Sequence, residues 1–137
     1  MALADMTQEE TDARNLELCK GIAETLDLIA CGDLYRDDDG EEYDASDLDE
    51  IPDDWEQVTI SDYFSSTYEI RYLVSDDLEY VAVKLMVAGG GPAIWVDTET
   101  CSVRLYWWGD RASYPLTSAA VSEIDAFASE LLEMRRC

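Results

Sequence analysis

The segment between residues 33 and 56, DLYRDDDGEEYDASDLDEIPDDWE, contains 13 acidic residues and one basic residue, Arg36, in 24 positions. Carboxylates at this density repel one another and oppose a compact structure. Large apolar residues interrupt the run, and disordered acidic tails rarely contain so many of them. These apolar residues are Leu34, Tyr35, Tyr43, Leu48, Ile51 and Trp55. We therefore predict an acidic connector over 33–66, with short helical turns, that these residues pin to a folded body.

The charge of the whole chain is strongly negative and unevenly distributed. The 137 residues include 32 Asp and Glu but nine Lys and Arg, which gives a formal net charge of −23. A small soluble domain typically carries a net charge of about 2 to 8 in magnitude. Residues 1–80 carry −21 of this charge and residues 81–137 carry −2. Such a field attracts basic surfaces and repels nucleic acid and anionic lipid. The expected partner is a basic protein, with no direct contact to nucleic acid or a membrane.

Hydrophobic periodicity predicts a helix within residues 1–32 of a single domain that spans 1–137. This helix begins near Thr7, where the sequence T-Q-E-E places Glu10 three residues after a capping hydroxyl, and it stops at Gly32. The apolar face recurs at spacings of three and four. Its members are Leu16, Cys19, Ile22, Ala23, Leu26, Ile29 and Ala30.

The second half of the chain has the pattern of an antiparallel sheet followed by a helix. Strand-forming residues alternate with a period of two, and short turns between them favour a meander. The four candidate strands are 68–74, 79–88, 93–98 and 102–108. A C-terminal helix begins at Thr117 or Ser118. The predicted fold class is α+β: an N-terminal helix, the acidic connector, and a four-stranded antiparallel sheet plus C-terminal helix over 67–137.

A short helical turn is also expected near the end of the connector. It covers residues 60–65 and begins after Thr59 or Ser61, either of which supplies a capping hydroxyl.

Catalytic, metal and cofactor sites lack their usual sequence signals. Histidine is absent, which removes the commonest general base and a principal zinc ligand. The glycine-rich run 89–92 lacks the Lys-Ser/Thr of a phosphate-binding loop, and the acidic run 37–42 does not fit the register of a calcium loop. No C-x-x-C pair occurs, and free thiols are expected. The cysteines are Cys19, Cys31, Cys101 and Cys137. We predict that the protein is not an enzyme and needs no cofactor or metal.

The aromatic stretch Y-W-W-G-D-R at 106–111 is the second unusual feature. Consecutive residues of a strand point to opposite faces, so one of Trp107 and Trp108 is expected in the core and the other on the surface. Exposed tryptophan is a frequent anchor of protein interfaces. We also expect Asp110 and Arg111 to form a local ion pair at the strand end.

No targeting or membrane-spanning segment is indicated. The first ten residues, MALADMTQEE, lack a basic region followed by an apolar run, and no run of about 18 apolar residues occurs. A cytoplasmic location is expected.

In size and composition the chain resembles the acidic anti-restriction and anti-CRISPR proteins of phages and mobile elements, which act as DNA mimics. The stretch from Val83 to Leu116 also resembles a small protein that recurs in mobile elements of Gram-positive bacteria. The first resemblance implies an inhibitor that acts in the cytoplasm of a bacterial host cell. This inhibitor binds the basic nucleic-acid-binding surface of a CRISPR effector or restriction enzyme and blocks the binding of DNA. The residues expected to contact this partner are Asp37, Asp38, Asp39, Glu41, Glu42, Asp44, Asp47, Asp49, Glu50, Asp53, Asp54 and Glu56. The sequence is compatible with a monomer and with a homodimer, and a homodimer would extend the charged surface.

An alternative is a noncatalytic adaptor or regulatory protein. In that case the sheet and Trp107 or Trp108 form the interface, and the acidic half tunes the association rate and specificity.

Overall fold

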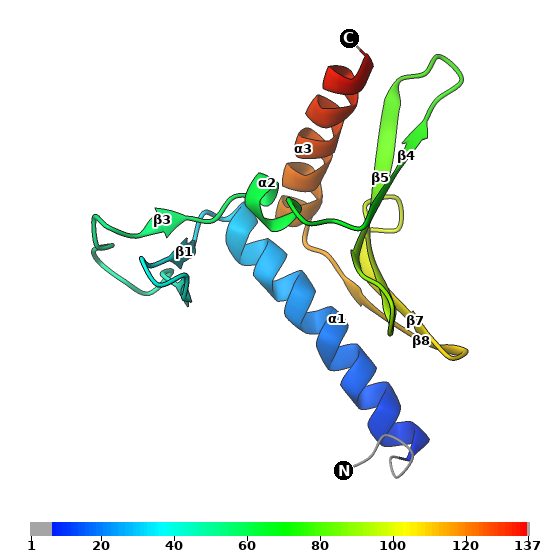
Figure 1. Ribbon diagram of the computed structural model, residues 1–137, viewed down its shortest axis with the longest axis horizontal. Coiled ribbons are helices and arrows are strands. Elements are labelled where there is room, and N and C mark those ends of the chain that lie inside the picture. The colour runs from blue at the N-terminus through cyan, green and yellow to red at the C-terminus, as the bar shows by residue number, and fades with distance from the viewer. Residues whose placement is uncertain (1–6, 137) are drawn as a thin grey trace.

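The computed structural model describes residues 7–136, which form three helices and two antiparallel sheets (Figure 1). Cys137, one of the four cysteines expected to be free thiols, lies outside the described residues. The helices are α1 (Gln8–Ala30), α2 (Ile60–Tyr63) and α3 (Ser118–Arg136). The smaller sheet has the strand order β2-β1-β3 and contains β1 (Leu34–Arg36), β2 (Glu42–Asp44) and β3 (Glu56–Gln57). The larger sheet has the order β4-β5-β6-β7-β8 and contains β4 (Glu69–Val74), β5 (Tyr80–Ala88), β6 (Ala93–Asp97), β7 (Ser102–Trp107) and β8 (Asp110–Pro115).

The predicted ends of α1 are confirmed. The Thr7 side chain accepts a hydrogen bond from the Glu10 N–H at 3.1 Å, which satisfies one free donor of the first turn. At the other end Gly32 has a φ of 77°, and the Asp33 N–H donates to the Leu28 carbonyl at 2.9 Å. This Schellman arrangement needs a left-handed residue, which glycine supplies with little strain.

The apolar face of α1 follows the prediction except at Leu16. Cys19, Ala23, Leu26 and Ile29 are buried, whereas Leu16 is 44% exposed. At 3.6 residues per turn, Asn15 lies nearer than Leu16 to the centre of the buried face, and Asn15 is fully buried. The helix therefore turns Leu16 toward the solvent.

The prediction of a four-stranded sheet is wrong, because the larger sheet has five strands. The missed strand, β8, pairs with β7 from Trp107↔Asp110 to Ser102↔Pro115. A two-residue turn connects them, with positive φ at Trp108 (52°) and Gly109 (83°), as a type I′ hairpin turn requires. The sequence pattern does not reveal this turn, because the aromatic run continues through it. It does not reveal β8 either, because this strand contains Asp, Arg, Ser and Pro rather than a series of strand-forming residues.

The prediction of short helical turns in the acidic connector is also wrong over most of its length, since this segment forms the smaller sheet. Its strands have three, three and two residues, which is too short to display a period of two in the sequence. The expected helical turn is confirmed after it, as α2. The Thr59 side chain accepts from the Asp62 N–H, and the Asp62 carboxylate accepts from the Thr59 N–H, each at 3.1 Å.

The layers of the body place two helices on one face of the larger sheet. Helices α1 and α3 cover this face, while the smaller sheet projects from the C-terminal end of α1, away from the body (Figure 1). The core between the layers contains Leu26, Leu85, Leu105 and Ile124, each with no exposed surface. Thr117 caps α3 by accepting from the Ala120 N–H at 3.2 Å. Within residues 7–136, no helix has the length and apolarity needed to span a membrane.

Candidate partner-binding surfaces

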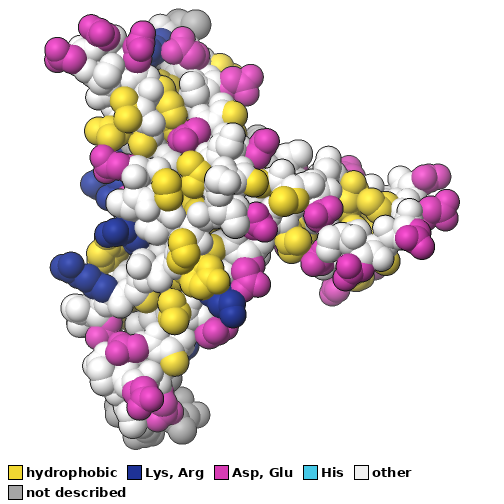
Figure 2. Space-filling view, turned by 180° about the vertical axis from the view of Figure 1, so that it is seen from behind, with side chains coloured by type: hydrophobic (Ala, Val, Ile, Leu, Met, Phe, Trp, Pro, Cys, Tyr) yellow, Lys and Arg dark blue, Asp and Glu magenta, His cyan; other side chains and the backbone are white. Residues whose placement is uncertain are grey.

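The acidic arm, defined as residues 33–58, displays almost all of the predicted partner-binding carboxylates on its surface. Eleven of the twelve are exposed, and Asp37 is half-buried. Figure 2 shows acidic side chains spread over the projecting arm, including its outer end. The exposed members are Asp38, Asp39, Glu41, Glu42, Asp44, Asp47, Asp49, Glu50, Asp53, Asp54 and Glu56. The structure thus brings these residues together on one folded element.

The loop between β1 and β2 is organised by the Asp37 carboxylate. Its Oδ1 accepts hydrogen bonds from the N–H groups of Asp39 (2.9 Å) and Glu41 (3.0 Å), and its Oδ2 accepts from the Tyr43 hydroxyl at 3.0 Å. Desolvation alone would raise the pKa of Asp37, but the hydrogen bonds from Glu41, Tyr43 and Asp39 hold this pKa below its usual value. The bond to Asp37 in turn raises the pKa of the Tyr43 hydroxyl. Asp37 therefore stabilises the loop between β1 and β2.

Aromatic stacking joins β2 to the residue before β3. The Tyr43 and Trp55 rings stack with centroids 4.7 Å apart and an interplanar angle of 9°. Arg36 lies 3.6 Å from the Glu56 carboxylate across the β1–β3 pair. The Val58 N–H donates to the Leu34 carbonyl at 2.9 Å, and both residues are buried in the main core. These contacts fix the carboxylates relative to the body.

Acid titration tests the role of Asp37. Because its folded-state pKa is lowered, its stabilising contribution is complete above the pKa of an unstructured aspartate and is lost as the pH falls through the lower folded-state value. We expect the amide NMR signals of Asp39 and Glu41 to titrate with a midpoint below that of an unstructured aspartate. Asp37→Asn should abolish this transition. A midpoint at or above the peptide value would contradict the assignment.

The two predicted tryptophans have different environments, as expected. Trp107 ends β7, is half-buried and packs against the core, and the Arg14 Cζ lies 4.9 Å from its ring centroid. Trp108 is 89% exposed. It occupies the β7–β8 turn rather than a strand, so the turn and not strand alternation exposes it.

A group of cations on the larger sheet was missed by the sequence analysis. This cationic face, on the side of the sheet opposite the helices, consists of Arg71, Lys84, Arg104 and Arg111. The pairs Arg71↔Lys84, Trp95↔Arg104 and Tyr106↔Arg111 are opposite each other across neighbouring strands, and opposed residues share a face. In Figure 2 a group of Lys and Arg side chains lies on the side of the body away from the arm.

A signal for this face was present in the sequence. Lys84 and Arg104 each lie between two buried apolar residues, as Arg104 does between Val103 and Leu105. Arg71 lies between two half-buried residues. The net charge of −23 obscures this pattern, because the total charge of a chain does not show where its cations are grouped.

The predicted Asp110–Arg111 ion pair is wrong. Asp110 Oδ1 instead accepts a hydrogen bond from Gln8 Nε2 at 2.9 Å, and the Arg111 Cζ lies 5.8 Å from the Tyr106 ring centroid. Adjacent strand residues point to opposite faces, which separates the two charges.

Among the residues described, no group of three or more Cys, Asp or Glu side chains is arranged to hold a metal ion. No family model, curated protein or solved structure matches the chain.

Proposed function

We propose that the acidic arm binds the basic nucleic-acid-binding surface of a CRISPR effector or restriction enzyme and blocks DNA binding by charge mimicry. The observation that carries this proposal is the display of eleven exposed carboxylates on one folded, projecting element.

The spacing of charge on the arm is suited to a groove that accepts DNA. Duplex DNA carries one negative charge per about 1.7 Å of its axis. Neighbouring strands lie about 4.8 Å apart, and strand residues advance about 3.3 Å. Because successive strand residues point to opposite faces, same-face neighbours on one strand lie about 7 Å apart and those on adjacent strands about 5 Å apart. Lysine and arginine side chains of a DNA-binding groove can engage carboxylates at this spacing.

The order of the arm reduces the entropic cost of binding. Side chains and loops that become immobilised at an interface each lower the affinity. The Tyr43–Trp55 stack and the hydrogen bonds to Asp37 order the arm before it meets a partner. A disordered acidic tail of the same composition would lose this advantage.

Competition with DNA tests the mechanism. The protein is titrated into a purified guide-loaded CRISPR effector and a panel of restriction enzymes, each with and without preloaded target DNA. We expect inhibition of cleavage that weakens steeply with salt, and binding that preloaded DNA prevents. Equally tight binding to an enzyme with and without its DNA would refute mimicry.

A second candidate function, the adaptor, is favoured by Trp108. This side chain is 89% exposed and has a φ of 52°, in the left-handed region that disfavours bulky residues. Asparagine or glycine suits this turn better, so the tryptophan stabilises the turn less than they would. An exposed aromatic at a hairpin tip is suited to contact a partner.

Trp108→Asn separates this function from mimicry. We expect the substitution to leave the free energy of unfolding unchanged or raise it by about 0.5–1 kcal/mol, because it relieves strain at a left-handed position. If the hairpin is the interface, the same variant loses partner binding, whereas a mimic retains it. Urea denaturation and a binding assay on one preparation give both readouts.

A further inference from the structure

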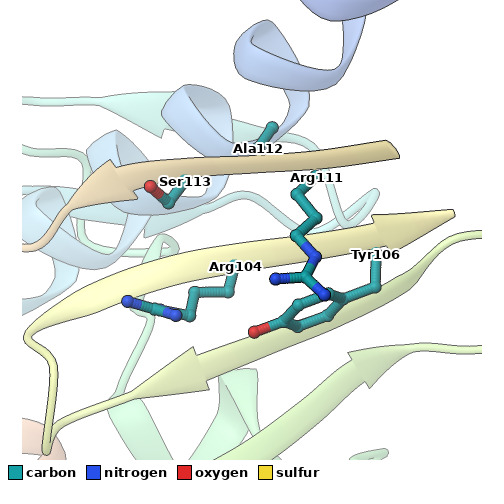
Figure 3. A pocket seen from close by; sticks show the side chains of 5 residues that line it. All are labelled: Arg104, Tyr106, Arg111, Ala112 and Ser113. Carbon is teal, nitrogen blue, oxygen red and sulfur yellow. The ribbon is translucent and has the colours of Figure 1, made fainter. Parts of the chain in front are cut away.

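The outer side of the β7–β8 hairpin contains a shallow hollow of about 300 Å³ lined by Arg104, Tyr106, Arg111, Ala112 and Ser113. The register sets Arg104 opposite Ser113 and Tyr106 opposite Arg111, so these four side chains share one face. Figure 3 shows the Arg111 guanidinium over the Tyr106 ring and the Arg104 side chain alongside on the same face. The hollow therefore combines two guanidinium groups, two hydroxyls and an aromatic ring.

The guanidinium groups of this hollow form no direct ion pair with a carboxylate of residues 7–136. Ion pairs to carboxylates are formed by Lys20, Arg36, Arg71 and Arg136. Neither Arg104 nor Arg111 forms one among residues 7–136, although the chain contains 32 acidic residues. Arg104 Nε donates to Ser102 Oγ at 3.2 Å. A side-chain hydrogen bond with Tyr106 also raises the pKa of Arg104. Since each guanidinium carries five N–H donors, several donors of the two groups stay available to a ligand.

We propose that this hollow binds a phosphoryl group carried by a small molecule. One guanidinium suffices to pair with the two oxygens of a carboxylate, whereas two guanidinium groups and two hydroxyls match the several terminal oxygens and the double charge of a phosphate monoester. The Arg111 guanidinium lies over the Tyr106 ring, and its own planar face can stack with a planar group attached to the phosphate. The ligand class is therefore a free phosphate or a nucleoside monophosphate.

The negative charge of the rest of the chain does not prevent anion binding here. The acidic arm projects from the other side of the body (Figures 1 and 2). Charges separated by more than the Debye length, about 8 Å at physiological ionic strength, are largely screened. The hydrogen bond with Tyr106 and the charge of Asp97 both raise the pKa of Arg104, which keeps this guanidinium charged. Two guanidinium charges at the hollow, those of Arg104 and Arg111, therefore outnumber this one nearby carboxylate.

Titrations followed by amide NMR test this site. Sodium phosphate and a nucleoside 5′-monophosphate are added separately at constant ionic strength, with sodium acetate as a carboxylate comparison. We expect both phosphates to shift the signals of Arg104, Tyr106, Arg111 and Ser113 in a saturable way, and acetate to leave them nearly unchanged. Equal affinity for the two phosphates identifies free phosphate as the ligand. Tighter binding of the monophosphate identifies a nucleotide whose base adds contacts beyond those of the phosphate.

Two variants with the same change in net charge provide the control. The double substitution Arg104→Gln and Arg111→Gln should weaken phosphate binding at least about tenfold, because it removes two charge-assisted contacts. The double substitution Lys20→Gln and Arg135→Gln removes two cations from the helices and should leave binding unchanged. The proposal is overturned if phosphate gives no saturable shift, if acetate binds equally well, or if both double variants weaken binding to the same degree. Dispersed NMR spectra of both variants show that the fold is retained.

Discussion

Replacement of six exposed arm carboxylates by amides is expected to weaken binding to the proposed nuclease partner at least about a hundredfold, because each close charge pair contributes on the order of 0.5–1 kcal/mol. The variant leaves Asp37, Asp44 and Glu56 intact, since their side chains stabilise the arm. It combines Asp38→Asn, Asp47→Asn, Asp49→Asn, Glu50→Gln, Asp53→Asn and Asp54→Asn. Binding is measured as a Kd over a range of salt concentrations, and the salt dependence should become shallower.

A matched control removes six carboxylates from the rest of the surface. These residues are exposed and lie on α1, on α3 and in the β4–β5 turn. The control combines Glu9→Gln, Glu17→Gln, Asp76→Asn, Asp77→Asn, Glu123→Gln and Glu130→Gln. Both variants have the same net charge, so a specific arm predicts a much smaller loss for the control. Equal losses would show that total charge, rather than the arm, attracts the partner.

Trp55→Ala is expected to open the arm while the body stays folded. The substitution removes the stack with Tyr43, which lies 4.7 Å away between ring centroids, and a three-stranded sheet of such short strands has few other contacts. We expect the free energy of local opening to fall by about 2 kcal/mol, which corresponds to about thirtyfold faster amide exchange. Partner binding should fall with it, because the carboxylates then lose conformational entropy on docking.

Hydrogen exchange at particular amides distinguishes local opening from global unfolding. In the arm, the Ala45 and Val58 N–H groups donate to Asp33 and Leu34 carbonyls at 2.8 and 2.9 Å. In the body, the Leu116 N–H donates to the Cys101 carbonyl at 2.8 Å. Faster exchange at Ala45 and Val58 alone supports the prediction. Trp55→Phe retains an aromatic ring and should lose much less protection. Equal acceleration at Leu116 would show that the arm and the body unfold together.

The two surfaces of this protein have opposite charge and are supported by different parts of the chain. The acidic arm depends on local contacts among residues 33–58, whereas the cationic face depends on the register of the larger sheet. The proposed inhibitor function and the proposed phosphoryl site can therefore be removed independently. The arm variant should leave phosphate binding intact, and the Arg104/Arg111 variant should retain DNA competition.

The sequence by itself determined the features that depend on neighbours in the chain. Capping at Thr7 and Thr59, the glycine stop at Gly32 and the amphipathic pattern of α1 involve residues a few positions apart. Hydrogen bonds and periodicity at this range are set by local backbone geometry. The concentration of carboxylates at 33–56, and hence the expectation of a basic partner, was likewise readable from the sequence.

The tertiary structure decided the features that depend on distant residues. Tyr43 and Trp55 meet only because the connector folds into a sheet, and Arg104 and Arg111 share a hollow only because a two-residue turn sets the register of β7 and β8. Strand pairing is a contact between separate segments, and a shift of one residue would move every side chain to the other face. Periodicity within one segment cannot fix that register. The acidic segment was thus visible in the sequence, but its three-stranded form and the cationic face of the larger sheet were products of the fold.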